Sequence, residues 1–119
     1  MNSAARAEVD DDERLDQVFR ALGDRTRRAL LARLARGSAS VTELATPFAM
    51  SLPAVSKHLR VLERAGLVAR TVEGRVHRCA LGPTPLRDAS EWLSAYRQFW
   101  DDSLASLAAY LEEGRDQER

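Results

Sequence analysis

Hydrophobic residues in the first third of the chain recur with the period of an α-helix. Between Glu13 and Gly23 they occupy positions i, i+3, i+4 and i+7, which predicts one buried helix face. Asp24 is a good N-cap for a second helix, which Gly37 ends. The residues before Glu13 are small or acidic, and we expect residues 1–12 to form a disordered tail.

Two shorter helices are predicted next, close together in the sequence. A capping-box pattern at Ser40 starts the first, and it ends near Phe48 because the preceding proline cannot donate a backbone hydrogen bond. Ser51 is the expected N-cap of the second helix, which covers residues 52–65 and stops at Gly66.

The hydrophobic period then changes from 3.6 to 2, which indicates β-strands. Alternation over residues 68–81, with a turn that includes Gly74, predicts a two-stranded hairpin. Thr84 is the expected N-cap of a last helix over residues 85–113, and a polar tail over residues 114–119 follows it.

These elements follow the order helix, helix, helix, helix, hairpin, helix. The 119 residues of the chain have room for one hydrophobic core. Two adjacent helices followed directly by a hairpin are typical of a winged helix-turn-helix. We therefore predict a mainly α fold with a two-stranded β wing, built as a single domain over residues 13–113.

The helix over residues 52–65 has two chemically different faces. At 100° per residue, three aliphatic residues cluster within about 60° and are expected to face the core. They are Val55, Leu59 and Leu62. The opposite face is small and basic, with Pro53, Lys57, Arg60 and Arg64, and Ser56 at its flank. A helix that enters the DNA major groove needs such a face, and Arg60 is the first candidate for a guanine contact because a guanidinium bonds O6 and N7 together. A solvated polar face is the alternative.

Positive charge is concentrated in the same region, although the whole chain is neutral. The first 24 residues carry a net charge of −4, from three basic and seven acidic groups. The next 54 carry +8, from eleven basic and three acidic groups, and the last 41 carry −4, from four basic and eight acidic groups. Arg70, Arg75 and Arg78 on the hairpin predict a wing that contacts the DNA backbone or the minor groove. The alternatives are solvated charge scattered over the surface and edge arginines that prevent strand pairing.

Three motifs mark the basic middle of the chain. They are D-x-T-R-R at Asp24–Arg28, S-x-x-A-V-S-K-H-L at Ser51–Leu59 and L-E-R-A-G-L-V at Leu62–Val68. With these motifs the chain resembles the ArsR/SmtB family of bacterial transcriptional repressors, over about residues 14–112. The resemblance implies a homodimer that binds a pseudo-palindromic operator in double-stranded DNA and represses its own or a neighbouring operon. Whether an effector ligand acts on it stays open.

The resemblance and the charge pattern together give a set of expected DNA contacts. The set is Ser51, Pro53, Ser56, Lys57, His58, Arg60, Arg64, Arg70, Arg75 and Arg78. By position, the resemblance implies the four members from Ser56 to Arg60 in the recognition helix, and Arg75 and Arg78 in the wing. His58 flanks the core face, where a packed, hydrogen-bonded histidine is the alternative.

Metal-sensing relatives carry ligands that this sequence lacks. The resemblance places cysteine pairs on the first helix of the helix-turn-helix, or histidines on the last helix. Here residues 42–46 contain no cysteine and the last helix contains no histidine. One cysteine and two histidines cannot supply the four N or S ligands that zinc prefers without help from carboxylates or a partner chain. We therefore predict no metal site and no cofactor.

Cys79 raises a separate possibility, because it alternates with His77 on one predicted strand. The two side chains should face the same way, and an imidazolium could lower the pKa of the thiol and create a redox sensor. A small hydrophobic residue beneath the wing is the alternative.

The last helix is long for a chain of this size. Its 29 predicted residues span about 43 Å, against a diameter of roughly 35 Å for a compact body. Its apolar arc is broad, so we predict that it packs on a second copy across a two-fold axis, together with the first helix. The predicted interface is Leu15, Val18, Phe19, Leu22, Trp92, Leu93, Tyr96, Phe99, Trp100, Leu104 and Leu107. An aromatic stripe buried within its own chain is the alternative.

Other classes of protein are less consistent with the sequence. No apolar run approaches the roughly 20 residues that cross a bilayer, and a single cysteine fits a reducing cytoplasm. No general base, nucleophile or cofactor loop is visible, so we do not expect an enzyme. The remaining alternative is the same fold with its basic face docked on an acidic protein.

Overall fold

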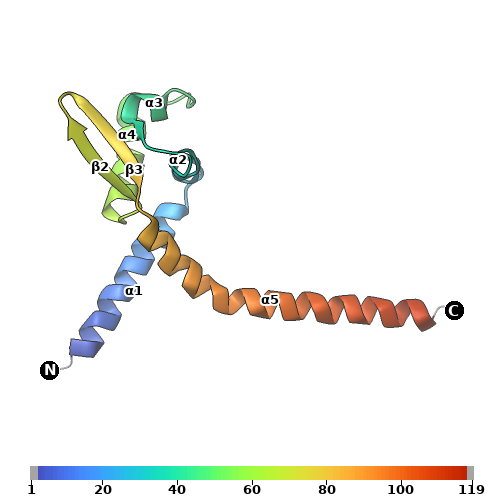
Figure 1. The fold of residues 1–119 in the computed structure, drawn as a ribbon. Coiled ribbons are helices and arrows are strands. Elements are labelled where there is room, and N and C mark those ends of the chain that lie inside the picture. Colours follow the sequence, from blue (N-terminus) through green and yellow to red (C-terminus); the bar gives the residue numbers. More distant parts are fainter. Residues whose placement is uncertain (1–2, 118–119) are drawn as a thin grey trace. The chain divides into compact units, whose positions relative to one another are not determined.

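A computed structural model describes residues 3–117 of the chain. Helices and short strands follow one another in the predicted order (Figure 1). They are α1 (Ser3–Leu22), α2 (Arg25–Leu34), β1 (Ala39–Ser40), α3 (Val41–Ala45), α4 (Leu52–Arg64), β2 (Val68–Glu73), β3 (Val76–Leu81) and α5 (Pro83–Gln117). The mainly α fold with a hairpin wing is confirmed. The chain divides into two compact units, one up to Ala89 and one from Ser90.

The predicted caps hold the helices of the helix-turn-helix in place. Asp24, Ser40 and Ser51 each accept a hydrogen bond from the backbone N–H three residues later, at 3.0, 3.1 and 3.3 Å. Each bond satisfies a first-turn donor that has no intrahelical acceptor. Gly66 follows the end of α4 with φ 74°, and the turn is closed by bonds from the N–H groups of Gly66 and Leu67 back to the last turn of α4. The boundaries of α4 match the prediction to within one residue.

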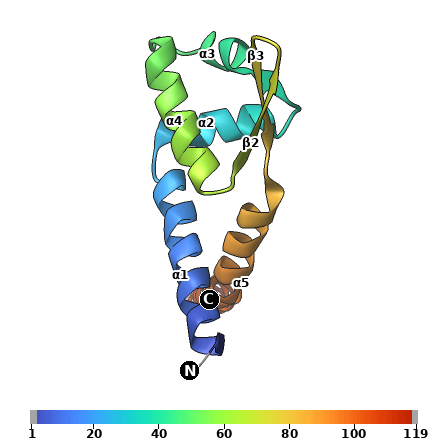
Figure 2. The same cartoon turned by 90° about the vertical axis from the view of Figure 1, so that its left-hand side faces the viewer.

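The core of the first unit lies among α1, α2, α4 and the sheet. Figure 2 shows α2 crosswise between α4 and the hairpin, and it contacts both. The largest side chains buried there are leucines, namely Leu30, Leu44, Leu59, Leu62 and Leu67. Each contributes about 1.5–3 kcal/mol by burial. Together they fix which face of α4 points inward.

The sheet contains a third strand that the sequence pattern does not predict. β1 pairs antiparallel with β3, so that Ala39 lies opposite Cys79. β2 pairs with β3 along its whole length, and the turn between them is Gly74-Arg75, with φ 64° at the glycine. Two residues are too few to show an alternating pattern, so the sequence does not predict β1.

The predicted disordered tail over residues 1–12 is wrong where the structure describes it. Helix α1 begins at Ser3 instead of Glu13, while residues 1 and 2 lie outside the described part. The added segment lacks hydrophobic periodicity, so the pattern gave no sign of a helix. It is nevertheless rich in alanine, which has the highest helix propensity of all residues.

Three other helix ends also differ from the prediction. α3 stops at Ala45 rather than near Phe48, although the N–H of Phe48 still bonds to the Ala45 carbonyl in a final turn. α5 begins at Pro83, before the expected cap Thr84, because first-turn residues need no N–H. It also continues through Gly114, whose cost of about 1 kcal/mol in a helix the neighbouring helix formers offset. The end of the predicted polar tail, residues 118–119, lies outside the described part.

Candidate nucleic-acid interface

Helix α4 buries one face and exposes a basic one. Val55, Leu59 and Leu62 are each 0% exposed, as the helical wheel predicts. The basic residues Lys57, Arg60 and Arg64 are exposed, and none of them has a hydrogen-bond or ion-pair partner among residues 11–115. Because rotating the helix would expose three aliphatic side chains, these cations stay directed away from the core.

The structure uses Arg70 to attach the wing to α4. Its Nε bonds to Oε1 of Glu63 in the last turns of α4, and both side chains are more than two-thirds buried. Arg70 is thus paired within the chain through Nε, and its contact with DNA stays a prediction. Seven residues separate the two, but the turn at Gly66 reverses the chain and brings them together.

The other two hairpin arginines remain available. Arg75 lies in the exposed two-residue turn, at the tip of the wing. Arg78 is half-buried and donates weakly to Oγ of Ser38, at 3.5 Å. Because Arg78 pairs with Thr71 in the register, it lies on the opposite face of the hairpin from Arg70.

His58 belongs to a hydrogen-bonded cluster rather than to the basic face. Its Nδ1 lies 3.3 Å from Nη1 of Arg27 and 3.7 Å from Oδ2 of Asp24. The structure thus has the packed, hydrogen-bonded arrangement that was the alternative for His58, and its contact with DNA stays a prediction. Arg27 also donates to the carbonyls of Ala21 and Arg20, at 2.7 and 3.0 Å, and so caps the C-terminal end of α1.

Asp24 completes this cluster as the N-cap of α2. The hydrogen bond from the backbone N–H of Arg27 lowers the pKa of Asp24 below its ordinary value of 3.8. The charges of His58 and Arg27 act in the same direction, while partial burial opposes them. The D-x-T-R-R motif therefore joins α1, α2 and α4, a role that sequence reasoning missed.

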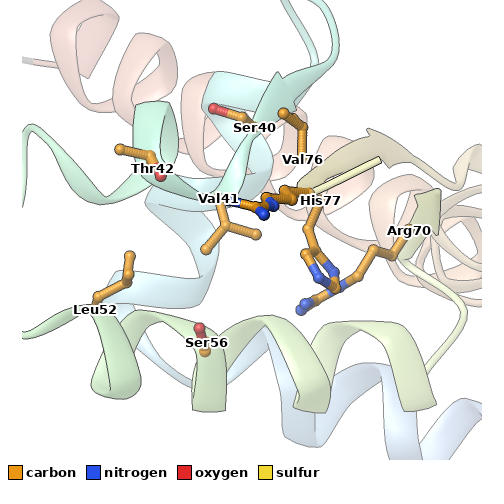
Figure 3. A pocket seen from close by; sticks show the side chains of 9 residues that line it. Ser40, Val41, Thr42, Leu52, Ser56, Arg70, Val76 and His77 are labelled. Carbon is orange, nitrogen blue, oxygen red and sulfur yellow. The ribbon is translucent and has the colours of Figure 1, made fainter. Parts of the chain in front are cut away.

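A cleft of about 400 Å³ separates the wing from the start of α4 (Figure 3). Cationic or imidazole groups line it from the hairpin, namely Arg70, Arg75 and His77. Hydroxyl groups line it from the helix-turn-helix, namely Ser40, Thr42 and Ser56. No lining residue is acidic. Of these six, Ser40, Thr42 and His77 stand outside the predicted DNA-binding set, because no local pattern shows that they meet.

Comparison with known proteins identifies the family. A family model described as a helix-turn-helix domain matches residues 22–71. The chain is 40% identical over 102 residues to the HTH-type transcriptional regulator Rv2034 of Mycobacterium tuberculosis, covering 85% of this chain and 92% of that protein. It superposes on a crystal structure named as the ArsR family transcriptional regulator RHA00566 with a TM-score of 0.70 at 43% identity, covering 76% and 93% of the two chains. The chain belongs to the ArsR family of transcriptional regulators.

Two further relatives of this ArsR-family chain have informative names. It is 30% identical over 90 residues to the transcriptional repressor SdpR of Bacillus subtilis, covering 76% of this chain and all of that protein. It also resembles the solution structure of a homodimeric winged helix-turn-helix DNA-binding domain, Mb0332 of Mycobacterium bovis, at 26% identity and a TM-score of 0.59, covering 87% and 91% of the two chains. Because the relatives are regulators, the protein-docking alternative is not favoured.

The remaining predicted DNA contacts keep a place on this surface of the ArsR-family fold. Ser51 and Pro53 are exposed at the start of α4, and Ser56 is half-buried at the edge of the cleft. The hydroxyl of Ser51 is already an acceptor as the helix cap. Its proton and its second lone pair remain for the predicted contact with DNA.

Cys79 does not have the environment that a redox sensor needs. It is 0% exposed in the core, opposite Ala39. Burial raises the pKa of its thiol, outweighing the nearby charge of Arg70. Since the thiolate is the reactive form, the small-hydrophobe interpretation fits the structure and the sensor interpretation does not.

Among residues 11–115, whose side chains the structure describes, no three His, Cys, Asp or Glu side chains gather where they could hold a metal ion. No helix among these residues has the length and hydrophobicity to cross a membrane.

The second unit of this ArsR-family chain is a helix with an uncovered apolar arc. Its large hydrophobic side chains are all between 48% and 72% exposed. They are Trp92, Leu93, Tyr96, Phe99, Trp100, Leu104, Leu107, Tyr110 and Leu111. At 100° per residue they occupy an arc of about 140°. An arc of this size and continuity marks a surface that another protein surface covers.

The interface residues predicted in α1 are less available. Val18 is 2% exposed and belongs to the core of its own unit. The prediction that it lies in the dimer interface is therefore corrected. Leu15, Phe19 and Leu22 pack against the same core but stay partly exposed. The helical period identifies a buried face without showing which chain buries it.

Proposed function

We propose that the chain works as a homodimeric repressor that places α4 in the major groove of its operator and the hairpin on the adjacent backbone or minor groove. The observation that carries this proposal is the two-faced character of α4. Its inward face is fully buried, while Lys57, Arg60 and Arg64 are exposed and unpaired among the described residues. Groups arranged in this way can meet guanine edges and phosphates without breaking any contact within the chain.

The apolar arc of the second unit supports the dimer. A helix with nine large hydrophobic side chains between 48% and 72% exposed gains stability by packing on a second copy. The homodimeric state named for Mb0332 and the repressor activity named for SdpR agree with this proposal. In such a dimer the two α4 helices enter successive major grooves, about 34–36 Å apart.

The same proposal defines where the protein acts and what it does not need. A regulator that binds chromosomal DNA works in the cytoplasm. Repression by occupying an operator requires no bond to be made or broken, so we infer a binding protein and not an enzyme.

Fluorescence anisotropy with the full chain tests the assignment of α4. A duplex selected from a pool of genomic fragments is compared with random duplex, for the wild type, Arg60→Ala and Arg36→Ala. Arg36 is exposed and lies after the end of α2, so its variant removes the same charge elsewhere. We expect Arg60→Ala to lose about 1–3 kcal/mol of the preference for the selected duplex, and Arg36→Ala to keep it. Equal preferences in the two variants would show that Arg60 takes no part in base recognition. If no duplex can be selected from the whole pool, the repressor proposal is refuted.

Sedimentation tests the dimer with two adjacent residues of α5. Leu104 lies within the apolar arc and Ala105 lies about 100° outside it, on the opposite side of the helix. Leu104→Glu should shift the protein toward the monomer and weaken operator binding, whereas Ala105→Glu should leave both unchanged. The same mass for all three proteins would show that the arc does not form the interface.

A further inference from the structure

The cleft between the wing and α4 has a chemistry that the proposed recognition contacts do not use. Nε of Arg70 is bound to Glu63, but its Nη2 is buried and has no hydrogen-bond partner among the described residues. A buried donor without an acceptor is costly, so native structures rarely leave one. Figure 3 shows the side chains of Arg70 and His77 extending from the hairpin toward α4, where Ser56 lies.

Six of the nine residues that line the cleft are polar and suit an anion, and the other three, Val41, Leu52 and Val76, are apolar. Arg75 and His77 add donors from the tip and from β3, and the hydroxyls of Thr42 and Ser56 can donate from the other side. No lining carboxylate competes for these donors or repels a negative group. Small-molecule pockets, by contrast, are mostly apolar and enclosed. Guanidinium, imidazole and hydroxyl donors converging on an open cleft are suited to phosphate oxygens.

The position of the cleft indicates where the phosphate comes from. It lies between α4 and the hairpin, the two elements that the proposed function assigns to neighbouring grooves. The strand of DNA that separates those grooves must pass between the same two elements. Ser56 and Arg75, which border the cleft, already belong to the expected contact surface.

We propose that this cleft binds one phosphodiester group of the DNA backbone, with Thr42 and His77 as phosphate-contacting residues. The inference rests on the proposed function, because it needs DNA on this face. The contact reads no base, so it strengthens binding to every sequence and sets how deeply the wing lies against the strand.

Single neutral methylphosphonate linkages in the duplex locate the contact. Anisotropy is measured with the full chain for the wild type and for the double variant Thr42→Val with His77→Phe, which keeps shape and removes the donors. The matched control is Thr71→Val, an exposed hydroxyl on the other face of the same hairpin. Urea midpoints are compared first, to show that all three proteins fold.

We expect the double variant to bind every duplex about 10-fold more weakly, with its preference between sequences unchanged, and Thr71→Val to bind as the wild type does. One methylphosphonate position, with its symmetry mate, should weaken the wild type by a similar factor and the double variant hardly at all. Wild-type affinity in the double variant, or losses that simply add at every methylphosphonate position, would overturn the proposal.

A second measurement separates this proposal from the proposed function. The melting temperature of each protein is recorded in inorganic phosphate and in chloride at equal ionic strength. If phosphate stabilises the wild type more than the double variant while DNA binding is unaffected by the substitutions, the ligand is a free phosphate and the DNA backbone is overturned as its source. If the wild type binds no DNA at all, the proposed function fails. In that case, stabilisation by phosphate in the wild type but not in the double variant still supports an anion site. If phosphate does not stabilise the wild type either, the anion site is overturned as well.

Discussion

Replacing Arg27 with methionine removes the side chain that joins three helices. In the native chain its Nε donates to the Ala21 carbonyl at 2.7 Å and its Nη2 to the Arg20 carbonyl at 3.0 Å. Nη1 lies 3.3 Å from Nδ1 of His58 on α4. Methionine retains most of the apolar stem, so Arg27→Met removes the hydrogen bonds with little loss of packing.

The expected loss follows from the burial of each bond. A hydrogen bond to a charged group contributes about 1.5–3 kcal/mol. The bonds to Ala21 and His58 are partly buried, whereas the bond to Arg20 is exposed and water can replace it. Measured contributions within one cluster overlap instead of adding. We therefore expect Arg27→Met to lower the free energy of unfolding by about 2–3 kcal/mol.

Urea unfolding, followed by circular dichroism at one protein concentration, measures this loss. Arg25→Met is the matched control, because Arg25 lies in the same first turn of α2, is exposed and has no partner in the described part of the chain. Its effect should stay within about 0.5 kcal/mol. The m value should be the same for both variants, so that the midpoints report stability alone. If Arg27→Met unfolds at the midpoint of Arg25→Met, the cluster does not hold α1, α2 and α4 together.

Three further predictions concern the core and the caps. Gly82→Ala would place a Cβ against the Gly66 carbonyl oxygen and should lower the free energy of unfolding in urea by about 1–3 kcal/mol. Gly114→Ala has open space around it and should be neutral or stabilise by up to about 1 kcal/mol, and equal effects of the two substitutions would contradict the close approach at Gly82. Cys79 is buried and burial raises the pKa of its thiol, so a thiol reagent should label it only as the native state opens, and rapid labelling of folded protein would contradict this. Because the pKa of Asp24 is lowered by folding, its stabilisation is complete well above its ordinary pKa of 3.8 and is lost as the pH falls through the lower folded value. Asp24→Asn keeps a cap that does not titrate, so urea midpoints between about pH 2 and about pH 6 should fall less steeply for this variant, and parallel curves would refute the role of the carboxylate.

Local rules predicted the parts of this fold whose partners are close in sequence. The caps at Asp24, Ser40 and Ser51 bond to N–H groups three residues away, so residue type and spacing suffice to find them. The core face of α4 follows in the same way from the helical period. Lys57 and Arg60 were placed on the exposed face because a helix with one buried face has only one other direction for them.

Pairs that meet through the tertiary fold could not be predicted in this way. Arg27 and His58 are 31 residues apart, and their contact depends on the angle at which α2 crosses α4. Arg70 looked like a wing cation because its neighbours are basic. Its pairing with Glu63 required the turn after α4, whose geometry places β2 against the helix. The cleft depends on the positions of both the wing and α3, so the sequence did not show that Thr42 and His77 meet there.

The contacts of α4 explain why its basic face is set before DNA arrives. Viewed down the helix, His58 lies about 60° to one side of the core residue Val55, and Glu63 lies about 80° to the other. His58 is held by Asp24 and Arg27, and Glu63 is held by Arg70. These contacts on both flanks of the buried face oppose rotation in either direction, so the helix presents its cations at one fixed angle. The cost of ordering that surface is met during folding and not during binding. Glu63→Gln should therefore weaken operator binding in an anisotropy titration, although Glu63 itself makes no proposed contact with DNA, because the substitution loosens the wing and the helix together. Wild-type affinity in this variant would refute the argument.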